Sequence, residues 1–426
     1  MGRSRHRILG VDATLVLTAL AIIVLCVYVL GTAIVRPDGG LDSSFAHRQM
    51  VFGVIGLFIA IGVSRIPVNF WQRWWPHALA LTIVLLILLR LIGTVVNGSR
   101  RWIDLGPVSL QPSEFGKVLA LITIAGFLAS RQREIREGRT FLLGLGLLGV
   151  PCVMVFLQPD FGTAQVYGYL ALGALFFAGA RWLHFAMLGG AIVVVSVLVL
   201  AVLPAVGLEV LHDYQKQRLT GFLDPEADAQ GSNYQTIQAK TAIGSGQLTG
   251  RPEGEASQVQ QGFLPEPQTD FIFATHTERY GFLGAALLLG LYMLLISRIL
   301  YAVGVAANPY SRLIAGGVAM LFFCQVFINV GMVIGVLPVT GVPLPMFSYG
   351  GSALWTNMAL LGLVVAVLRE AESPTVRYQR RTGRPTAGFG SLRATSSERA
   401  PARRPTASTP GMPYTAGSSR RRRRRT

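Results

Sequence analysis

Residues 262–274 read GFLPEPQTDFIFA, and this stretch joins a polar segment to an apolar run that continues to Ser297. Asp270 therefore lies where water meets membrane, directly before the apolar residues 271–274. A carboxylate in that position is partly desolvated and can meet a substrate that has a polar head and a lipid tail. The simpler alternative is that Asp270 only caps a helix over 271–297.

The rest of the chain has the composition of a membrane protein. Of its 426 residues, 51% are hydrophobic and only 14% are charged, with a mean hydropathy of +0.49. Soluble domains carry about 25% charged residues. Apolar runs of about 20 residues, each long enough to cross a bilayer as a helix, recur along the sequence. We read them at roughly 12–35, 50–66, 76–96, 114–130, 141–157, 162–180, 183–206, 271–297, 312–336 and 349–368.

The fold class that follows is all-α. We expect a polytopic integral membrane protein with about ten transmembrane helices, spanning about 1–370, and one large extracytoplasmic loop at about 207–270. An alternative for the segment 97–113 is that it dips into the membrane without crossing it. Cys26, Cys152 and Cys324 fall in apolar runs, which indicates small buried side chains instead of disulfides or metal ligands.

The distribution of arginines predicts the orientation. With both termini cytoplasmic, most of the basic loop residues fall on the inner side, as the positive-inside rule requires. The exceptions are Arg100 and Arg101, which fall outside, followed by Lys117. The tail, 371–426, holds fourteen arginines among Pro, Ser, Thr and Gly and is expected to be disordered. Such a tail is attracted to anionic lipid, by about 1 kcal/mol per charge, and no aromatic or motif pattern supports nucleic-acid binding.

The long loop carries candidate ligands for phosphate. Residues 236–246, TIQAKTAIGSG, place Ile237, Ala239, Ala242 and Ile243 on one face of a short helix. That helix either lies on the membrane surface or packs against the protein as a plug. Lys216, Arg218 and Lys240 lie on the outer side, where topology does not require positive charge, and are candidates for binding phosphate or pyrophosphate. Taken individually, a basic residue of this kind is more often a solvated surface charge.

Further polar residues mark the helix ends. Glu114 and Lys117 are three residues apart and share a helix face. They form either a structural ion pair or a pair that contacts substrate. Asp160, in the turn QPDFG at 158–162, either caps the next helix or adds a second carboxylate to the same cavity. Gln325 and Asn329 are expected to make interhelical hydrogen bonds.

These segments together resemble the SEDS (shape, elongation, division and sporulation) family. The motifs are RRWIDLG at 100–106, QPSEFGK at 111–117, QPDFGT at 158–163, YQKQRLTGFLDPEADAQGSNYQ at 214–235, IGSG at 243–246, FLPEPQTDFIFA at 263–274 and NVGMVIGVLPVTGVPLPMFSYGGS at 329–352. They occur in order over about residues 10–370. Within the family, the motifs look more like the RodA-like branch, of elongation, than the FtsW-like branch, of division.

The resemblance implies a function. Family members are bacterial inner-membrane glycosyltransferases that polymerise the peptidoglycan precursor lipid II into glycan strands, with a class B penicillin-binding protein that crosslinks them. The family's essential loop aspartate falls on Asp270, its buried pair on Glu114 and Lys117, and its QPD aspartate on Asp160. Where the family usually has His-Thr-Asp, this chain has Gln268 before Thr269 and Asp270.

In the mechanism that we expect, Asp270 is the general base, or orients the GlcNAc 4-hydroxyl that attacks the donor. One carboxylate and no covalent nucleophile imply inversion. The leaving pyrophosphate needs positive charge, for which the candidates are Arg100, Arg101, Lys117, Arg218 and Lys240, or a divalent cation such as Mg²⁺. The rival functions are a lipid II flippase or other transporter, the division-associated polymerase, and a non-catalytic scaffold for the penicillin-binding protein.

Overall fold

The computed structural model describes residues 7–8, 11–33, 42–96, 99–104, 106, 108–205, 234–252, 264, 266–374 and 376. Within these residues, ten helices are long and apolar enough to cross a membrane, as predicted. They are α1 (Ala13–Ala33), α2 (Ser44–Arg65), α3 (Val68–Ile92), α4 (Pro112–Ser130), α5 (Gly138–Phe156), α6 (Phe161–Ala178), α7 (Trp182–Val197) with its continuation through η2 (Leu198–Val202) and α8 (Leu203–Ala205), α12 (Ile272–Val305), α13 (Pro309–Val333) and α14 (Gly351–Ala371). Arg218 and the Arg-rich tail lie outside the described residues, so the expectations for them stay predictions.

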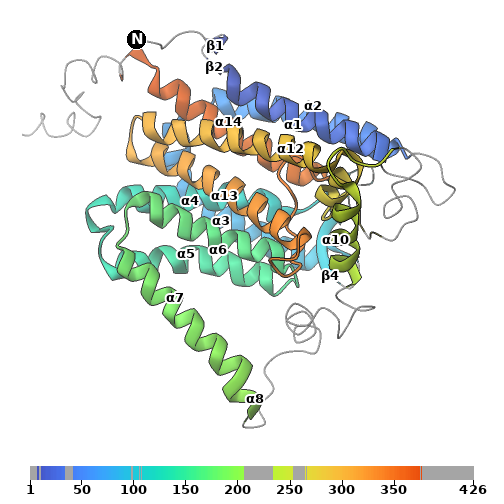
Figure 1. The fold of residues 1–426 in the computed structure, drawn as a ribbon. Coiled ribbons are helices and arrows are strands. Elements are labelled where there is room, and N and C mark those ends of the chain that lie inside the picture. Colours follow the sequence, from blue (N-terminus) through green and yellow to red (C-terminus); the bar gives the residue numbers. More distant parts are fainter. Residues whose placement is uncertain are drawn as a thin grey trace, which may run out of the picture. The chain divides into compact units, whose positions relative to one another are not determined.

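Apart from α7, the membrane-length helices run roughly side by side (Figure 1), and α4, α13 and α14 have the largest buried shares. These three are largely buried, and each contacts several neighbours. In contrast, α7 has no buried residue and extends away from the other helices (Figure 1). Because a helix satisfies its own backbone hydrogen bonds, such an apolar rod is compatible with a hydrocarbon environment.

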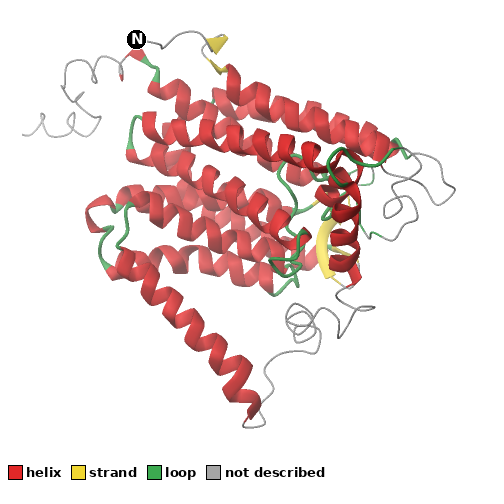
Figure 2. Cartoon of the chain, viewed as in Figure 1, coloured by secondary structure: helices red, strands yellow, loops and turns green. Residues whose placement is uncertain are grey.

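Short elements join the helices. They are β1 (Arg7–Ile8), β2 (Val11–Asp12), β3 (Thr94–Val96), β4 (Ser99–Asp104), β5 (Ser109–Leu110), η1 (Gln132–Glu134) and α10 (Tyr234–Gly246). The strands β3, β4 and β5 form an antiparallel sheet (Figure 2), so Ser99–Asp104 and Ser109–Leu110, within the segment considered for dipping into the membrane, are β-strands. Its run of β-branched and aromatic residues favours strands. The sheet and α10 lie at the same end of the bundle, which we call the site end (Figure 1).

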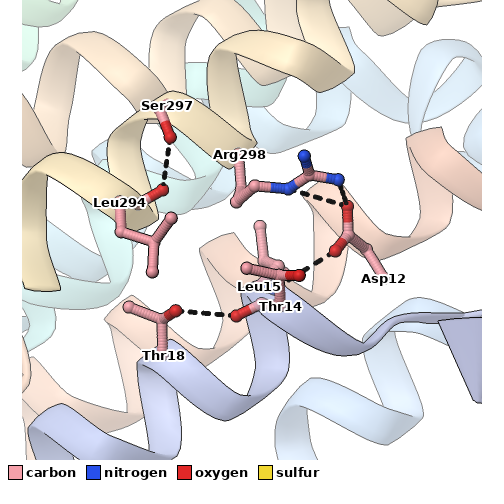
Figure 3. Close-up of polar contacts among 7 residues, drawn as sticks. All are labelled: Asp12, Thr14, Leu15, Thr18, Leu294, Ser297 and Arg298. Atoms are coloured by element: carbon pink, nitrogen blue, oxygen red, sulfur yellow. Dashed lines mark hydrogen bonds and ion pairs between the residues drawn. The ribbon is translucent and has the colours of Figure 1, made fainter. Parts of the chain in front are cut away.

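Three helix boundaries differ from the prediction by six residues or more. Helix α3 begins at Val68, before the expected position 76. Helix α2 begins at Ser44, before the expected position 50, although its first turns are polar. Gln49 is buried there, and its Oε1 accepts a hydrogen bond from the Gly350 backbone N–H at 3.2 Å, which compensates the buried amide. Helix α12 continues to Val305, so Arg298 lies in a helix and not in a loop. Figure 3 shows the Arg298 guanidinium pointing at the Asp12 carboxylate, with which it forms an ion pair.

Helix α12 is broken at Gly281, whose backbone is left-handed at φ 67°. At the break, the N–H groups of Phe282 and Leu283 donate to the carbonyls of Gln247 and Leu248 at 2.8 and 3.1 Å. The loop after α10 thus replaces helical hydrogen bonds that the break removes. Helix α10 packs on α12 through buried residues such as Ala239 and Ala242, so the plug interpretation of this helix is correct.

Candidate functional site

The Asp270 carboxylate lies at the site end of the bundle, just before α12. The residue at the cap position of α12 is Phe271, and no side chain caps the helix, so capping does not explain Asp270. The side chain is half-buried. A methyl group placed on Gly341 would lie 3.3 Å from Asp270 Oδ2, so the carboxylate faces the backbone of the broken segment 338–350.

Three charged groups act on this carboxylate. The pKa of Asp270 is raised to about 6, chiefly by desolvation and in smaller part by the neighbouring carboxylates of Glu266 and Asp160. The guanidinium of Arg101 opposes them and lowers the pKa. A carboxyl group with a pKa near 6 is largely ionised at neutral pH yet remains a useful proton acceptor.

Asp160 caps a helix and also acts electrostatically on Asp270. Its Oδ1 accepts a hydrogen bond from Thr163 N at 3.2 Å and caps α6, and its Oδ2 accepts one from Gln111 Nε2 at 3.0 Å. The turn that carries it approaches the broken segment closely, because a methyl group on Gly162 would lie 2.5 Å from the Thr340 carbonyl. Asp160 is therefore a helix cap that is also held close enough to affect Asp270.

The two arginines of β4 point in different directions. The Arg101 guanidinium donates to the Pro159 carbonyl, next to Asp160. Arg100 is exposed, and its guanidinium donates to the Arg90 carbonyl at the end of α3, at 3.4 Å. Neighbouring residues of a strand face opposite sides. The structure therefore brings Arg101 to Asp270 but does not bring Arg100 there.

Glu114 and Lys117 form an ion pair in the first turns of α4. The distance from Lys117 Nζ to Glu114 Oε2 is 2.6 Å, and each side chain is 3% exposed. The Tyr167 hydroxyl donates to the carbonyl of the preceding Ser113 at 3.0 Å and ties α6 to this turn. The predicted pair is confirmed, and neither residue is among the groups that act on Asp270.

Lys240 is not among the charged groups that act on Asp270. It is exposed on α10, and its side chain passes over Gly335 at the end of α13. A cation there suits the negative end of the α13 dipole. Of the predicted cations, Arg101 alone is placed beside Asp270 in the described part of the chain.

Sequence reasoning missed how the Asp270 loop is held. Three consecutive backbone carbonyls of this loop accept hydrogen bonds. Tyr349 N donates to Gln268 O at 2.9 Å, and Ser348 Oγ donates to Thr269 O at 2.8 Å. Asn329 Nδ2 donates to Asp270 O at 3.0 Å. The expectation of an interhelical bond is wrong for Asn329, because its amide bonds to loop carbonyls. The two amides Gln325 and Asn329 in a largely apolar helix, followed by a Pro- and Gly-rich segment, were the available signal.

The side chains around Asp270 offer few free oxygen or nitrogen donors to a metal ion. Among the described residues, no group of three or more His, Cys, Asp or Glu side chains could hold one. The acidic groups that affect Asp270 are Glu266 and Asp160, and Asp160 Oδ1 and Oδ2 already accept hydrogen bonds. The described residues around Asp270 therefore do not fit a divalent cation.

The fold and this site define a class, that of multi-pass membrane proteins with a polar cluster at one end of the helix bundle. The model of the FtsW/RodA/SpoVE family, described as a cell cycle protein, matches residues 11–373. The chain belongs to this family, the SEDS family of the sequence comparison above.

Known proteins of the family align over most of their length. Peptidoglycan glycosyltransferase MrdB of Escherichia coli K12 is 38% identical over 356 residues, which are 84% of this chain and 93% of that protein. Stage V sporulation protein E of Bacillus subtilis is 36% identical over 360 residues, 83% of this chain and 95% of that protein. Two solved structures are similar. One is a chain of a peptidoglycan synthase complex that coordinates polymerization and crosslinking, with a TM-score of 0.71 and 31% sequence identity; the match covers 86% of this chain and 100% of that chain. The other is Thermus thermophilus RodA, with a TM-score of 0.60 and 28% sequence identity; the match covers 86% of this chain and 99% of that chain.

Proposed function

We propose that this protein is a peptidoglycan glycosyltransferase that polymerises lipid II into glycan strands for cell elongation. The observation that carries the proposal is the half-buried Asp270 carboxylate, whose pKa is raised to about 6 where a polar loop enters the helix bundle. The similarity to MrdB, named a peptidoglycan glycosyltransferase, and to RodA supports the activity and the elongation role.

In the proposed reaction, Asp270 accepts the proton of the GlcNAc 4-hydroxyl of one lipid II as that oxygen attacks the anomeric carbon of the donor. The bond between that carbon and the undecaprenyl pyrophosphate breaks, and the pyrophosphate leaves with the bonding electron pair. Attack from the opposite face inverts the anomeric centre. Arg101, which the fold holds beside the cluster, supplies positive charge towards the pyrophosphate.

The proposed location is the bacterial inner membrane, with both termini cytoplasmic and the site end facing outward. The arginines between the helices support this orientation. A class B penicillin-binding protein is the proposed partner, because a similar chain belongs to a complex that polymerises and crosslinks. The Arg-rich tail would contact anionic lipid on the cytoplasmic side.

The test is gel-resolved polymerisation of labelled lipid II by the purified protein with its penicillin-binding partner. Wild type should give long glycan products and Asp270→Ala none, with the variant still folded in detergent. Equal products from both would move the base elsewhere, to Asp160 or Glu266. An absence of product from both would favour the flippase or scaffold function.

A further inference from the structure

Asn329 is a fully buried amide near the end of α13 that joins two loops. Its Nδ2 donates to the Asp270 carbonyl at 3.0 Å and to the Val342 carbonyl at 2.9 Å. Both partners are carbonyl oxygens, which only the NH₂ side of the amide can face, so the orientation of the side chain is determined. No other side chain donates a hydrogen bond to both segments among the described residues.

The other half of the amide has no partner. Asn329 Oδ1 is buried, and no hydrogen-bond donor contacts it in the described part of the chain. An unpaired buried acceptor costs free energy, and an apolar residue would avoid that cost if packing of α13 were the only requirement. The amide is thus explained by its two donor bonds, which are made to the loops and not to another helix.

The two loops that Asn329 joins both lie at the Asp270 carboxylate. One carries Asp270 itself, and the other carries Gly341, the residue that lies against Asp270 Oδ2 and precedes Val342. Ser348 and Tyr349 bind the neighbouring carbonyls of Thr269 and Gln268, but they belong to the loop. Asn329 alone among these donors belongs to a long, buried helix, so it fixes both loops to the rigid part of the protein.

We propose that Asn329 is a positioning residue for glycan polymerisation: it sets the separation between the Asp270 carboxylate and the 338–350 segment and thereby holds the carboxylate in line with the acceptor hydroxyl. The inference rests on the proposed function of Asp270. Asn329 bonds to backbone carbonyls and lies at 0% exposure, so it does not contact substrate. Misplacement of a reacting group by about 1 Å can cost roughly a hundredfold in rate.

The test compares Asn329→Ala with Gln325→Ala in the full chain with its penicillin-binding partner. Gln325 lies one turn earlier on α13, is also buried, and has no hydrogen bond to the Asp270 loop among those described, so it is a matched control. Rates of labelled lipid II polymerisation are measured against substrate concentration and pH. Asn329→Ala should lower kcat roughly ten- to a hundredfold, with KM changed by less than about twofold. Gln325→Ala should retain kcat within about threefold.

The pH profile separates positioning from loss of folded protein. Glu266, Asp160 and Arg101 are the charged groups that face Asp270, and the substitution leaves all three in place. When the loop loosens, the carboxylate becomes better hydrated, so the acid limb of kcat/KM, expected near pH 6 in wild type, should move to lower pH. Loss of folded protein would lower the maximal rate but would not change the pH at which the rate falls on the acid side. Asn329→Ser retains one donor group, so its kcat and the pH of its acid limb should lie between those of wild type and Asn329→Ala.

The outcomes distinguish this inference from the proposed function. A normal kcat and an unmoved limb in Asn329→Ala, with Asp270→Ala inactive, would overturn the positioning role alone. Equal losses in Asn329→Ala and Gln325→Ala, with unmoved limbs, would also overturn it. Full activity of Asp270→Ala would instead overturn the proposed base.

Discussion

Lys117 Nζ lies 2.6 Å from Glu114 Oε2, and both side chains are buried in the first turns of α4. A buried pair of charges is stable only while both partners are present, because a single remaining charge is desolvated without compensation. The two explanations of this pair, a structural ion pair or a contact to substrate, therefore differ in what happens when both charges are removed together.

We expect Lys117→Met or Glu114→Gln alone to destabilise the protein by about 3–5 kcal/mol. The double variant should be close to wild type in thermal stability. Thermal unfolding in detergent measures the stability, and lipid II polymerisation by the double variant decides the role. A folded, active double variant would establish a structural pair, whereas a folded, inactive one would place the pair in contact with substrate. Single variants as stable as wild type would contradict the buried pair itself.

The raised pKa of Asp270 predicts a pH-dependent effect on stability. Its pKa is about 6 in the folded protein against 3.8 normally, so the folded state holds this proton more tightly than the unfolded chain. The stabilisation that this provides is fully present below pH 3.8 and is lost as the pH rises through 6.

Asp270→Asn removes the charge that is costly above pH 6. The variant should match wild type near pH 4 and unfold at a higher temperature at pH 8. An effect of about 1 kcal/mol, allowing for the partial exposure of Asp270, corresponds to roughly 2–4 °C. Asp104→Asn changes an exposed carboxylate of β4 and is the control. An Asp270→Asn curve parallel to that of wild type at every pH would refute the pKa shift.

The break in α12 predicts that Gly281 cannot be replaced. Its φ of 67° is unfavourable for other residues, and a Cβ would meet the backbone of Leu248 and Gly250. We expect Gly281→Ala to cost at least about 1–3 kcal/mol. Gly290→Ala in the same helix, where a Cβ meets nothing within 4 Å, should be neutral or slightly stabilising. Equal melting temperatures of the two variants would show that α12 is not broken at Gly281.

The ion pair of Arg298 with Asp12 should be measurable by a double-mutant cycle. Asp12→Asn retains a side chain that can cap α1 through the Leu15 N–H, so the cycle with Arg298→Met isolates the ion pair. We expect a coupling of roughly 1 kcal/mol, because Asp12 is buried and Arg298 half-buried. The exposed pair Arg131 and Glu134, 3.4 Å apart, is the reference and should give less than about 0.5 kcal/mol. Equal couplings in the two cycles would show that burial adds nothing.

Several features of the site were accessible from the sequence, because they depend on local patterns. The ten apolar runs predicted the ten helices, and a spacing of three residues predicted the Glu114–Lys117 pair. The boundary of α2 was missed because its polar first turn masks a buried Gln49 that bonds to Gly350, a residue 301 positions away. Hydropathy averages over neighbours and contains no information about such a distant partner.

Which of the predicted cations lies beside Asp270 was likewise not accessible from the sequence. From the sequence, Arg100, Arg101 and Lys240 were equivalent candidates for the pyrophosphate. The alternation of side chains along β4 and the docking of α10 on α12 separated them, because they direct Arg101 to Asp270 and the other two elsewhere.

By itself the sequence determined the class of protein, the number of membrane helices and the position of Asp270 at the start of α12, since each depends on composition and on residues close in the chain. Only the tertiary structure decided what surrounds that carboxylate. Asp160, Arg101, Asn329 and Gly341 come from separate elements, and their approach to Asp270 depends on how the helices pack. Desolvation and Coulomb interactions act over a few ångströms in space, regardless of separation along the chain, so the pKa of Asp270 is a property of the folded protein.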